Sequence, residues 1–253
     1  MVPRALKPVG IALVDKPAGP SSFAVVAALR RRTRARTGHA GTLDPFATGL
    51  LVLLSGAATR LAPCFVGLDK RYVADVDLTA TTTTGDPEGE VVERHPARSR
   101  AAVEEALARL RGAVELPIPA ASAVKIGGER AYRLARRGVD VEMPLRRSHV
   151  HALDVIAYSG DPAAHTVRLE LHVSSGTYVR SIAHALGGHC TSLRRIAVGP
   201  FTIDEAGPVE EATLLPVVDV LDRLPAAALE QVPEPVRAGV LALDAPVGNG
   251  SAA

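Results

Sequence analysis

Two stretches of this chain alternate apolar and polar residues with a period of two, one from Tyr72 to Leu78 and one from Val167 to Val173. This period places successive side chains on opposite faces of a strand, so each stretch predicts a half-buried strand. An apolar run at 50–54 and segments at 9–14 and 196–203 predict three further strands. The chain must therefore fold around a β-sheet.

Helical patterns interrupt these strands without regular alternation. Ser21 or Ser22 can cap a helix reaching to about residue 36, and Ser99 can cap another that ends at Gly112. A short helix is expected at 129–137. A further helix begins near Thr177 and buries a face that comprises Val179, Ile182, Ala183 and Leu186. The mixture predicts an α+β fold, with a mixed or antiparallel sheet flanked by helices.

Composition excludes several classes of protein. With no Trp and 3% aromatic residues, the core must consist mainly of Ala, Val, Leu and Ile. Cys64 and Cys190 lack a metal-ligand spacing, which argues against a zinc knuckle or a disulfide framework and favours a cytoplasmic location. Because no apolar run approaches the ~20 residues of a membrane helix, we expect no membrane association.

Charge is distributed unevenly along the chain. Residues 1–72 hold 11 Lys and Arg against 3 Asp and Glu, whereas residues 202–253 hold 2 Arg against 9 acids. The basic third suggests a polyanionic partner. Its densest part holds Arg30, Arg31, Arg32, Arg34 and Arg36. Part of this run can instead serve the C-terminal end of a helix, whose dipole favours cations.

The acidic end is predicted to be an appendage. Its Ala-, Pro- and acid-rich composition begins near Gly207. The 45 residues at 209–253 are fewer than a lone domain usually needs. We therefore predict a catalytic domain at 1–207 and a short acidic tail at 208–253, packed or partly disordered.

The segment GHAGTLDPFATGLL at 38–51 has the greatest density of candidate functional residues. It combines glycines with His39 and Asp44 directly before a buried apolar run, and loops at strand ends often carry catalytic groups. Local alternatives exist for both residues. Asp44 followed by Pro45 is typical of a helix N-terminus, and His39 can be a loop histidine bonded to backbone.

This segment resembles the catalytic motif of TruB-type pseudouridine synthases, and other motifs of that family follow in the same order. The matching segments are LVDKPAGPSS (13–22), GAATR (56–60), DKRY (69–72), SAVK (122–125), RAY (130–132), GTYVR (176–180) and LRRI (193–196). Together they span about residues 9–200. Any one of them alone would be weak evidence, but chance agreement of the ordered set is negligible.

The resemblance implies an enzyme that isomerises uridine 55 in the T loop of tRNA to pseudouridine, without metal or organic cofactor. Its essential carboxylate falls on Asp44, and the matching Arg180 is expected to form an ion pair with it that keeps it ionised. Tyr72 matches the aromatic that packs on the base, and Leu193 an apolar wall. The alternative for Arg180 is a solvated surface arginine with no catalytic role. The alternative for Tyr72 is a tyrosine that only packs in the core. The sequence leaves open whether Asp44 is a nucleophile or a base.

The target uridine must be flipped out of the folded T loop. The resemblance implies that His39 occupies the space that the base leaves. Lys16 and the five arginines listed above are expected to contact the RNA, with salt-dependent affinity.

The chain departs from the family in three places. Many members carry an aromatic residue where this chain has Ala121, and many carry an Asp within the Thr-rich segment, which reads TTTTGD at 81–86 in this chain. The tail is also too short for an RNA-binding domain of the PUA type. We expect a monomeric enzyme without an obligatory protein partner. Alternatives are a guide-RNA-dependent synthase, a tRNA-binding folding factor whose catalysis is dispensable, and an unrelated small-molecule enzyme with a glycine-rich loop.

Overall fold

The computed structural model describes residues 8–139, 141–160 and 165–244. It divides into two compact units. Unit 1 combines Met1–Leu68 with Ala197–Ala253, and unit 2 is Asp69–Ile196. Within the described part of the chain, residues 8–68 and 197–244 therefore fold together, and the intervening residues form a second body.

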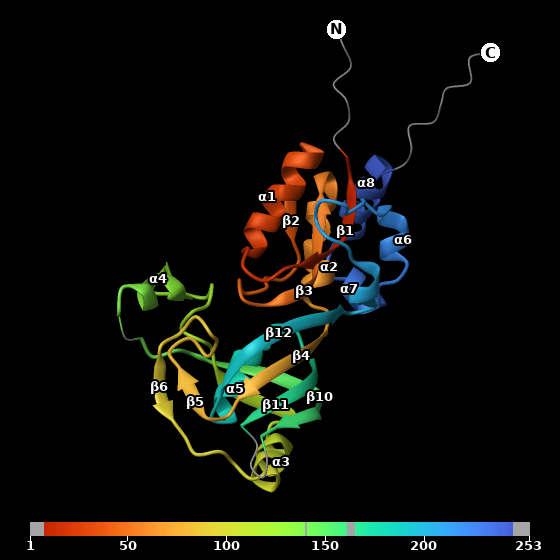
Figure 1. Ribbon diagram of the computed structural model, residues 1–253. Helices are drawn as coiled ribbons and strands as arrows, with labels where there is room; N and C mark the ends of the chain where they lie inside the picture. The colour runs from red at the N-terminus through yellow and green to blue at the C-terminus, as the bar shows by residue number, and fades with distance from the viewer. Residues whose placement is uncertain (1–7, 140, 161–164, 245–253) are drawn as a thin grey trace, which may run out of the picture. The chain divides into compact units, whose positions relative to one another are not determined.

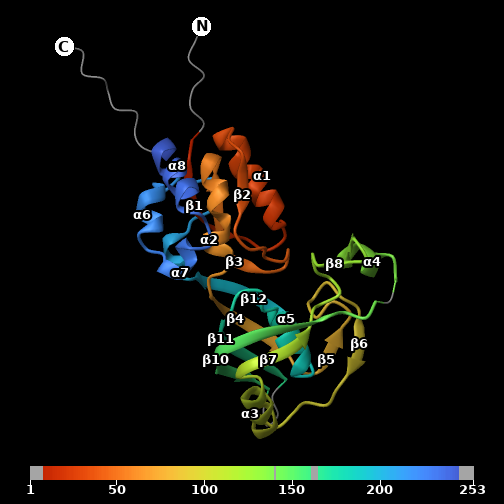
Figure 2. The ribbon, with the colours of Figure 1, turned by 180° about the vertical axis from the view of Figure 1, so that it is seen from behind.

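Unit 1 is built from short helices around paired strands. Its elements are β1 (Gly10–Lys16), α1 (Ser22–Thr33), β2 (Thr37–His39), β3 (Thr48–Ser55), η1 (Gly56–Leu61), α2 (Ala62–Val66), β13 (Phe201–Thr202), η2 (Ile203–Glu205), α6 (Val217–Leu221), α7 (Ala226–Leu229) and α8 (Glu234–Asp244). β3 pairs antiparallel with both β1 and β2. α1 lies on one side of β1 and β3, and α6 and α8 lie on the other, as both views show (Figures 1 and 2).

The core of unit 1 is mainly aliphatic, as the composition predicts, with the Phe65 and Phe201 rings 6.0 Å apart within it. The C-terminal helices contribute Val217, Val220 and Val240 to the same cluster as β1 and β3. Residues 208–244 thus pack in unit 1 with residues 8–68. The division into a catalytic domain at 1–207 and a tail at 208–253 stays a prediction about function, and residues 245–253 lie outside the described part.

Helix α1 begins as predicted but ends earlier. Ser21 caps it by accepting a hydrogen bond from the Ala24 amide. The predicted end at residue 36 is wrong, because the helix stops at Thr33 and Arg34 takes a left-handed conformation with φ of 53°. The Thr33 hydroxyl bonds the Leu29 carbonyl and accepts from the Ala35 amide, which offers the backbone an alternative to another helical turn.

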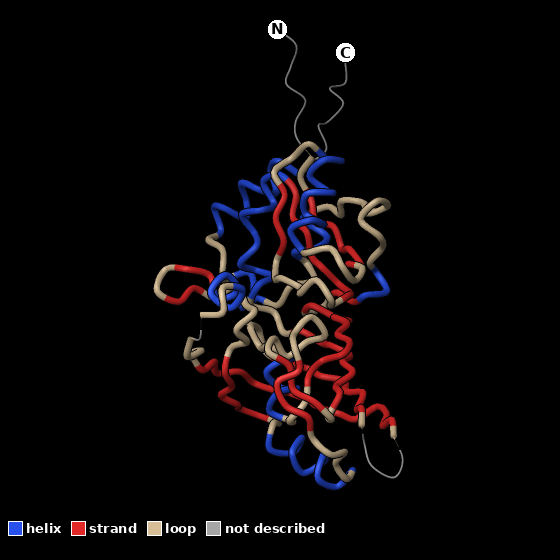
Figure 3. Tube along the Cα trace, turned by 60° about the vertical axis from the view of Figure 1, so that its left-hand side comes forward, coloured by secondary structure: helices blue, strands red, loops and turns tan. Residues whose placement is uncertain are grey.

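Unit 2 is dominated by strands (Figure 3). Its elements are β4 (Lys70–Asp77), β5 (Ala80–Thr82), β6 (Val91–Arg94), α3 (Arg100–Arg109), β7 (Gly112–Pro117), β8 (Lys125–Ile126), β9 (Glu129–Arg130), α4 (Ala131–Arg136), β10 (Leu145–Ser159), β11 (Thr166–Val173), α5 (Val179–Ala185) and β12 (His189–Val198), whose last two residues belong to unit 1. The strand order of its sheet is β12-β4-β11-β10-β7, and β4, β11, β10 and β7 pair antiparallel in turn.

The predicted strands at Tyr72–Leu78 and Val167–Val173 are confirmed as β4 and β11, and Ser99 caps α3 as expected. The single strand predicted at 196–203 is wrong. Gly199 has φ of 53°, and the chain turns there so that β13 pairs back on the end of β12, with Val198 opposite Phe201. The long strand β10 was not predicted, because its apolar residues follow no simple period.

These elements confirm the predicted α+β class, with a sheet and flanking helices. Among the residues that the structure describes, no helix has the length and apolar character required to cross a membrane.

Candidate active site

Asp44 lies in the connection between β2 and β3, which the structure describes in full. Gly41 and Gly49 bracket it with φ of 107° and 104°, values that favour glycine. No helix begins at Asp44, so the helix-capping alternative is wrong. In a helix the Pro45 carbonyl would accept a hydrogen bond from the amide four residues on. Here it accepts from Lys16 and Gly19.

The N-terminal segment holds this loop through backbone atoms on both sides of Asp44. The Ser22 hydroxyl donates to the Leu43 carbonyl at 2.9 Å and accepts from the Leu43 amide at 2.8 Å. The Gly19 amide donates to the Pro45 carbonyl at 2.8 Å. Two neighbouring residues of the catalytic candidate are therefore fixed by a separate part of the chain. Such bonds restrict the positions that its carboxylate can take.

Lys16 links this loop to the N-terminal segment. Its side chain is fully buried, and Nζ donates to the carbonyls of Pro17 at 2.8 Å, Pro20 at 2.8 Å and Pro45 at 3.1 Å. These bonds match the three N–H donors of an ammonium group. An RNA contact by Lys16 stays a prediction, but its burial favours a positioning role.

We expect Lys16→Met to lower the free energy of unfolding by at least about 3 kcal/mol, because the variant loses three hydrogen bonds from a charged donor, each of which contributes about 1.5 to 3 kcal/mol. Urea unfolding measures the loss. Hydrogen exchange should also become faster at residues 42–47. Lys125→Met, at an exposed lysine, is the matched control, and an equal loss in both variants would contradict the positioning role.

The other predicted site residues of unit 1 lie beside this loop or on α1. His39 is half-buried at the end of β2, opposite Leu53 of β3. The side chains of Arg30, Arg31, Arg32, Arg34 and Arg36 are exposed at and beyond the end of α1. Arg32 differs from the rest, because its guanidinium donates to the carbonyls of Val209 and Ala212. Arg32 is therefore attached to the C-terminal segment and is less available for an RNA contact.

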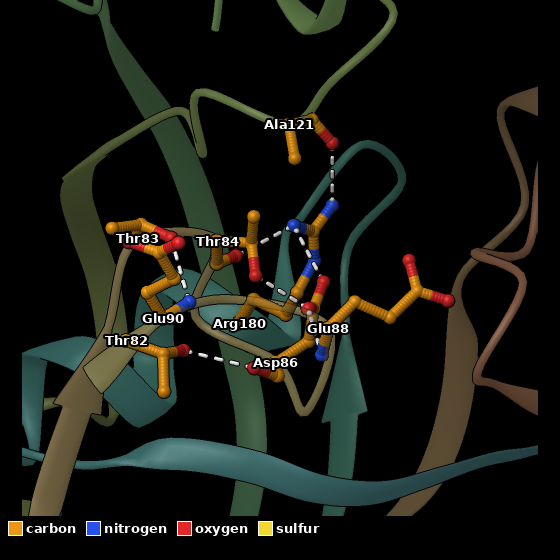
Figure 4. A network of polar contacts seen from close by, with 8 residues as sticks. All are labelled: Thr82, Thr83, Thr84, Asp86, Glu88, Glu90, Ala121 and Arg180. Atoms are coloured by element: carbon orange, nitrogen blue, oxygen red, sulfur yellow. Dashed lines mark hydrogen bonds and ion pairs between the residues drawn. The ribbon is translucent and has the colours of Figure 1, made fainter. Parts of the chain in front are cut away.

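In unit 2, Arg180 is buried, with 3% of its surface exposed. The alternative of a solvated arginine is therefore wrong. Helix α5 is buried at Arg180 and Ser181 as well as on its predicted apolar face. The Arg180 guanidinium donates to the carbonyls of Thr84 at 2.7 Å and Ala121 at 2.9 Å, and its Nη1 lies 3.2 Å from Asp86 Oδ2 (Figure 4).

Asp86 is held as firmly as its partner. It is 4% exposed, and its Oδ1 accepts from the Thr84 hydroxyl and from the Glu88 amide. Gly85, with φ of 71°, makes the tight turn before it, and a Cβ there would lie 3.5 Å from Arg180 Cβ. The ion pair is thus enclosed and bonded on both sides, which is the arrangement that buried charges require.

Asp86 is a residue whose importance the sequence reasoning missed. The Thr-rich run and Ala121 were interpreted as departures from the family. Both segments instead bind Arg180, one through Asp86 and Thr84 and the other through the Ala121 carbonyl. A backbone carbonyl does not depend on residue type, so the pattern of side chains carried no signal for the Ala121 contact.

Tyr72 and Leu193 are buried on β4 and β12, and Tyr72 pairs with Leu171 of β11. Lys70, two residues before Tyr72 on the same face, was also missed. Burial, reinforced by the charge of Arg195 and opposed by Asp69, lowers the pKa of Lys70 to about 8. A buried lysine that titrates near neutrality beside a predicted catalytic tyrosine is a further candidate for proton transfer.

The structure thus groups the predicted residues in two sets. Unit 1 carries Lys16, His39, Asp44 and the arginines, whereas unit 2 carries Tyr72, Arg180 and Leu193. Since Asp44 and Arg180 belong to different units, their ion pair stays a prediction.

Comparison with known proteins identifies the family. The model described as "TruB family pseudouridylate synthase (N terminal domain)" matches residues 30–179. The chain is 43% identical over 229 residues to tRNA pseudouridine synthase B of Thermobifida fusca (strain YX), an alignment covering 84% of this chain and 78% of the relative. It is 44% identical over 222 residues to the protein of that name from Mycobacterium leprae (strain TN), covering 82% and 69%.

Solved structures agree on the fold. A chain in the crystal structure of a Cbf5-Nop10-Gar1 complex superposes with a TM-score of 0.59 at 27% identity, covering 78% of this chain and 51% of that one. This chain therefore spans about half the length of that solved relative. Because the family model covers more than half of the chain and several relatives exceed 40% identity, the chain belongs to the TruB family of pseudouridylate synthases.

Proposed function

We propose that this protein converts uridine 55 in the T loop of tRNA to pseudouridine, with Asp44 as the catalytic carboxylate. As a family member it is an isomerase that makes pseudouridine in tRNA. The position in the T loop and the roles of individual residues are the proposed part. The observation that supports the role of Asp44 is its loop, which Lys16, Gly19 and Ser22 fix on both sides of Asp44.

The reaction breaks the N-glycosidic bond of the uridine, turns the base over and rejoins it through carbon 5. In these reaction steps Asp44 acts as a carboxylate, either by attacking a carbon of the substrate or by stabilising positive charge that develops on the sugar. A fixed loop favours both roles, because the carboxylate does not have to be reoriented when the charge develops. In this proposal Arg180 is the cation that keeps Asp44 ionised.

Tyr72 and Leu193 are proposed to contact the flipped base, and His39 to fill the space that it leaves in the RNA. An aromatic ring suits the first role because every base has a face on which it can stack. A planar imidazole suits the second role for the same reason. The cost of flipping, a few kcal/mol, is recovered through these contacts.

Arg30, Arg31, Arg34 and Arg36 are proposed to contact phosphates of the T arm. Their exposure at the end of α1 supports this role. Arg32 is the weakest member of the set, because two of its guanidinium nitrogens already donate to carbonyls of the tail segment. We further propose that the enzyme works as a monomer in the cytoplasm, without an obligatory partner; its two buried cysteines form no disulfide, which is compatible with a reducing compartment.

The substrate is tested with a T-arm stem–loop RNA and with the same RNA carrying cytidine at position 55. We expect the chain alone, without added metal or cofactor, to form pseudouridine at position 55 of the first RNA only. Carbodiimide labelling followed by primer extension locates the product. We also expect the apparent affinity to fall steeply as salt rises, because phosphate contacts dominate RNA binding.

Full-length tRNA and an unrelated uridine-rich hairpin are the controls. Pseudouridine at another position of the tRNA would overturn the T-loop assignment while keeping the enzyme class. Binding of tRNA without any product would favour the folding-factor alternative. Activity only after addition of a guide RNA would favour the guide-dependent one.

A further inference from the structure

Three potential metal ligands gather on one face of the sheet in unit 2. They are Asp69, directly before β4, His151 of β10 and His172 of β11. His172 pairs with Arg71, and alternation along β4 puts Asp69 on the same face as Arg71. Tyr72 lies on the opposite face. The group is therefore separate from the residues proposed for catalysis in this unit.

A β-bulge brings His151 to this face. The pairing of β10 with β11 shifts between Val150 and Ala152, so His151 and Ala152 both lie opposite His172. Bulges characteristically redirect a side chain in this way. As a result, the rings of His151 and His172 have centroids 4.6 Å apart, and the ring of His149 lies 4.7 Å from that of His151.

The two distances from the Asp69 carboxylate to the imidazole nitrogens are close to those between neighbouring ligands of a tetrahedral site. Asp69 Oδ2 lies 3.2 Å from His151 Nε2 and 3.7 Å from His172 Nε2, and one ligand atom of each residue lies within 4.8 Å of the others. Zinc bonds of about 2.1 Å to nitrogen and oxygen require neighbouring ligands about 3.4 Å apart in a tetrahedron. We propose that Asp69, His151 and His172 bind one divalent transition-metal ion of the zinc class.

The donor set suits this class of ion. Imidazole nitrogen is a preferred ligand of zinc and its neighbours in the first transition row, whereas calcium and magnesium prefer oxygen. Three protein ligands leave a fourth position for water. The Asp69 carboxylate supplies the negative charge that offsets part of the charge of the ion.

The surroundings are compatible with a bound cation. Arg71, a positive side chain on this face, directs Nη1 toward Glu170 at 4.0 Å. Because the ligands come from three neighbouring strands, a bound ion would cross-link them and stabilise unit 2.

Isothermal titration calorimetry of the tag-free full chain, freed of metal with a chelator, tests this site. We expect one Zn²⁺ to bind per chain. Asp69→Asn and His172→Ala should each weaken binding by at least about tenfold, since even partners outside the coordination sphere change metal affinity by 10- to 100-fold. Zn²⁺ should also raise the melting temperature of the wild type but not of His151→Ala/His172→Ala.

His165→Ala, at an exposed histidine outside the cluster, is the matched control and should bind like the wild type. The double histidine variant keeps Cys64 and Cys190, so binding through thiols would persist in it. The proposal is overturned if the wild type binds no Zn²⁺, or if the double variant, folded by circular dichroism, binds it equally well. Neither result bears on pseudouridine formation.

Discussion

Replacing Asp44 with Asn is expected to reduce pseudouridine formation by at least about 10⁴-fold, the scale on which loss of an essential catalytic group lowers the rate of an enzyme. Asn has the size of Asp but can neither attack as a carboxylate nor stabilise positive charge on the sugar. The bonds from Lys16, Gly19 and Ser22 to this loop involve backbone atoms of Leu43 and Pro45 and survive the change. RNA affinity should therefore change by no more than a few-fold.

Single-turnover conversion of the T-arm stem–loop measures the rate, and fluorescence anisotropy measures binding. Asp219→Asn is the matched control, because it removes the same charge from an exposed position in the same unit. A variant at Asp44 that keeps more than a hundredth of the rate would contradict the assignment. Loss of rate and of RNA affinity together would mean that Asp44 acts in binding.

The sequence predicted the elements whose two faces differ. β4 and β11 each bury one face, so their alternation identified them, and Ser99 marked the start of α3 through its side chain. Such signals are local. The end of α1 was harder to predict, because the Thr33 hydroxyl competes with the helix only once the backbone is folded around it.

The Asp44 loop shows how a tertiary contact overrides a local pattern. Asp followed by Pro is typical of a helix start, and its neighbours in sequence do nothing to oppose that interpretation. The Pro45 carbonyl is instead bound by Lys16, 29 residues away. Resemblance to a family predicted Asp44 as the catalytic carboxylate, but only the structure shows what holds its loop.

The buried charges were also beyond prediction from the sequence. Arg180 lies off the apolar face of α5, and arginines in that position are usually solvated. It is covered by segments 96 and 59 residues away, which supply the carbonyls of Thr84 and Ala121. The histidine cluster has a similar origin, because it depends on a bulge in β10 that follows no simple sequence period.

The Arg180–Asp86 pair leads to the second large effect. Arg180→Met is expected to lower the free energy of unfolding by about 3 to 5 kcal/mol, because it leaves Asp86 as a buried charge without its counter-ion. The side chains of the pair are only 2% and 5% exposed. Pseudouridine formation should be lost as well, if Arg180 is the cation that keeps Asp44 ionised.

A double-mutant cycle separates these two consequences. Arg180→Met/Asp86→Leu removes both charges and should recover much of the stability that the single variant loses, since apolar replacement of a buried ion pair is often close to neutral. It should recover no activity. A double variant that is stable, binds RNA and still forms pseudouridine would show that Arg180 has only a structural role.

The surface pair of Arg168 and Asp75 in the same unit provides the matched control. Its two hydrogen bonds, at 2.7 and 2.9 Å, are as short as those of Arg180, but its side chains are 52% and 21% exposed. Water screens such a pair, so Arg168→Met should lower the free energy of unfolding far less than Arg180→Met does. If urea unfolding gave equal losses of unfolding free energy for Arg168→Met and Arg180→Met, burial of the ion pair would not explain the effect of Arg180→Met. A larger loss at Arg180, with recovery in the double variant, would identify the enclosed charge as the cause.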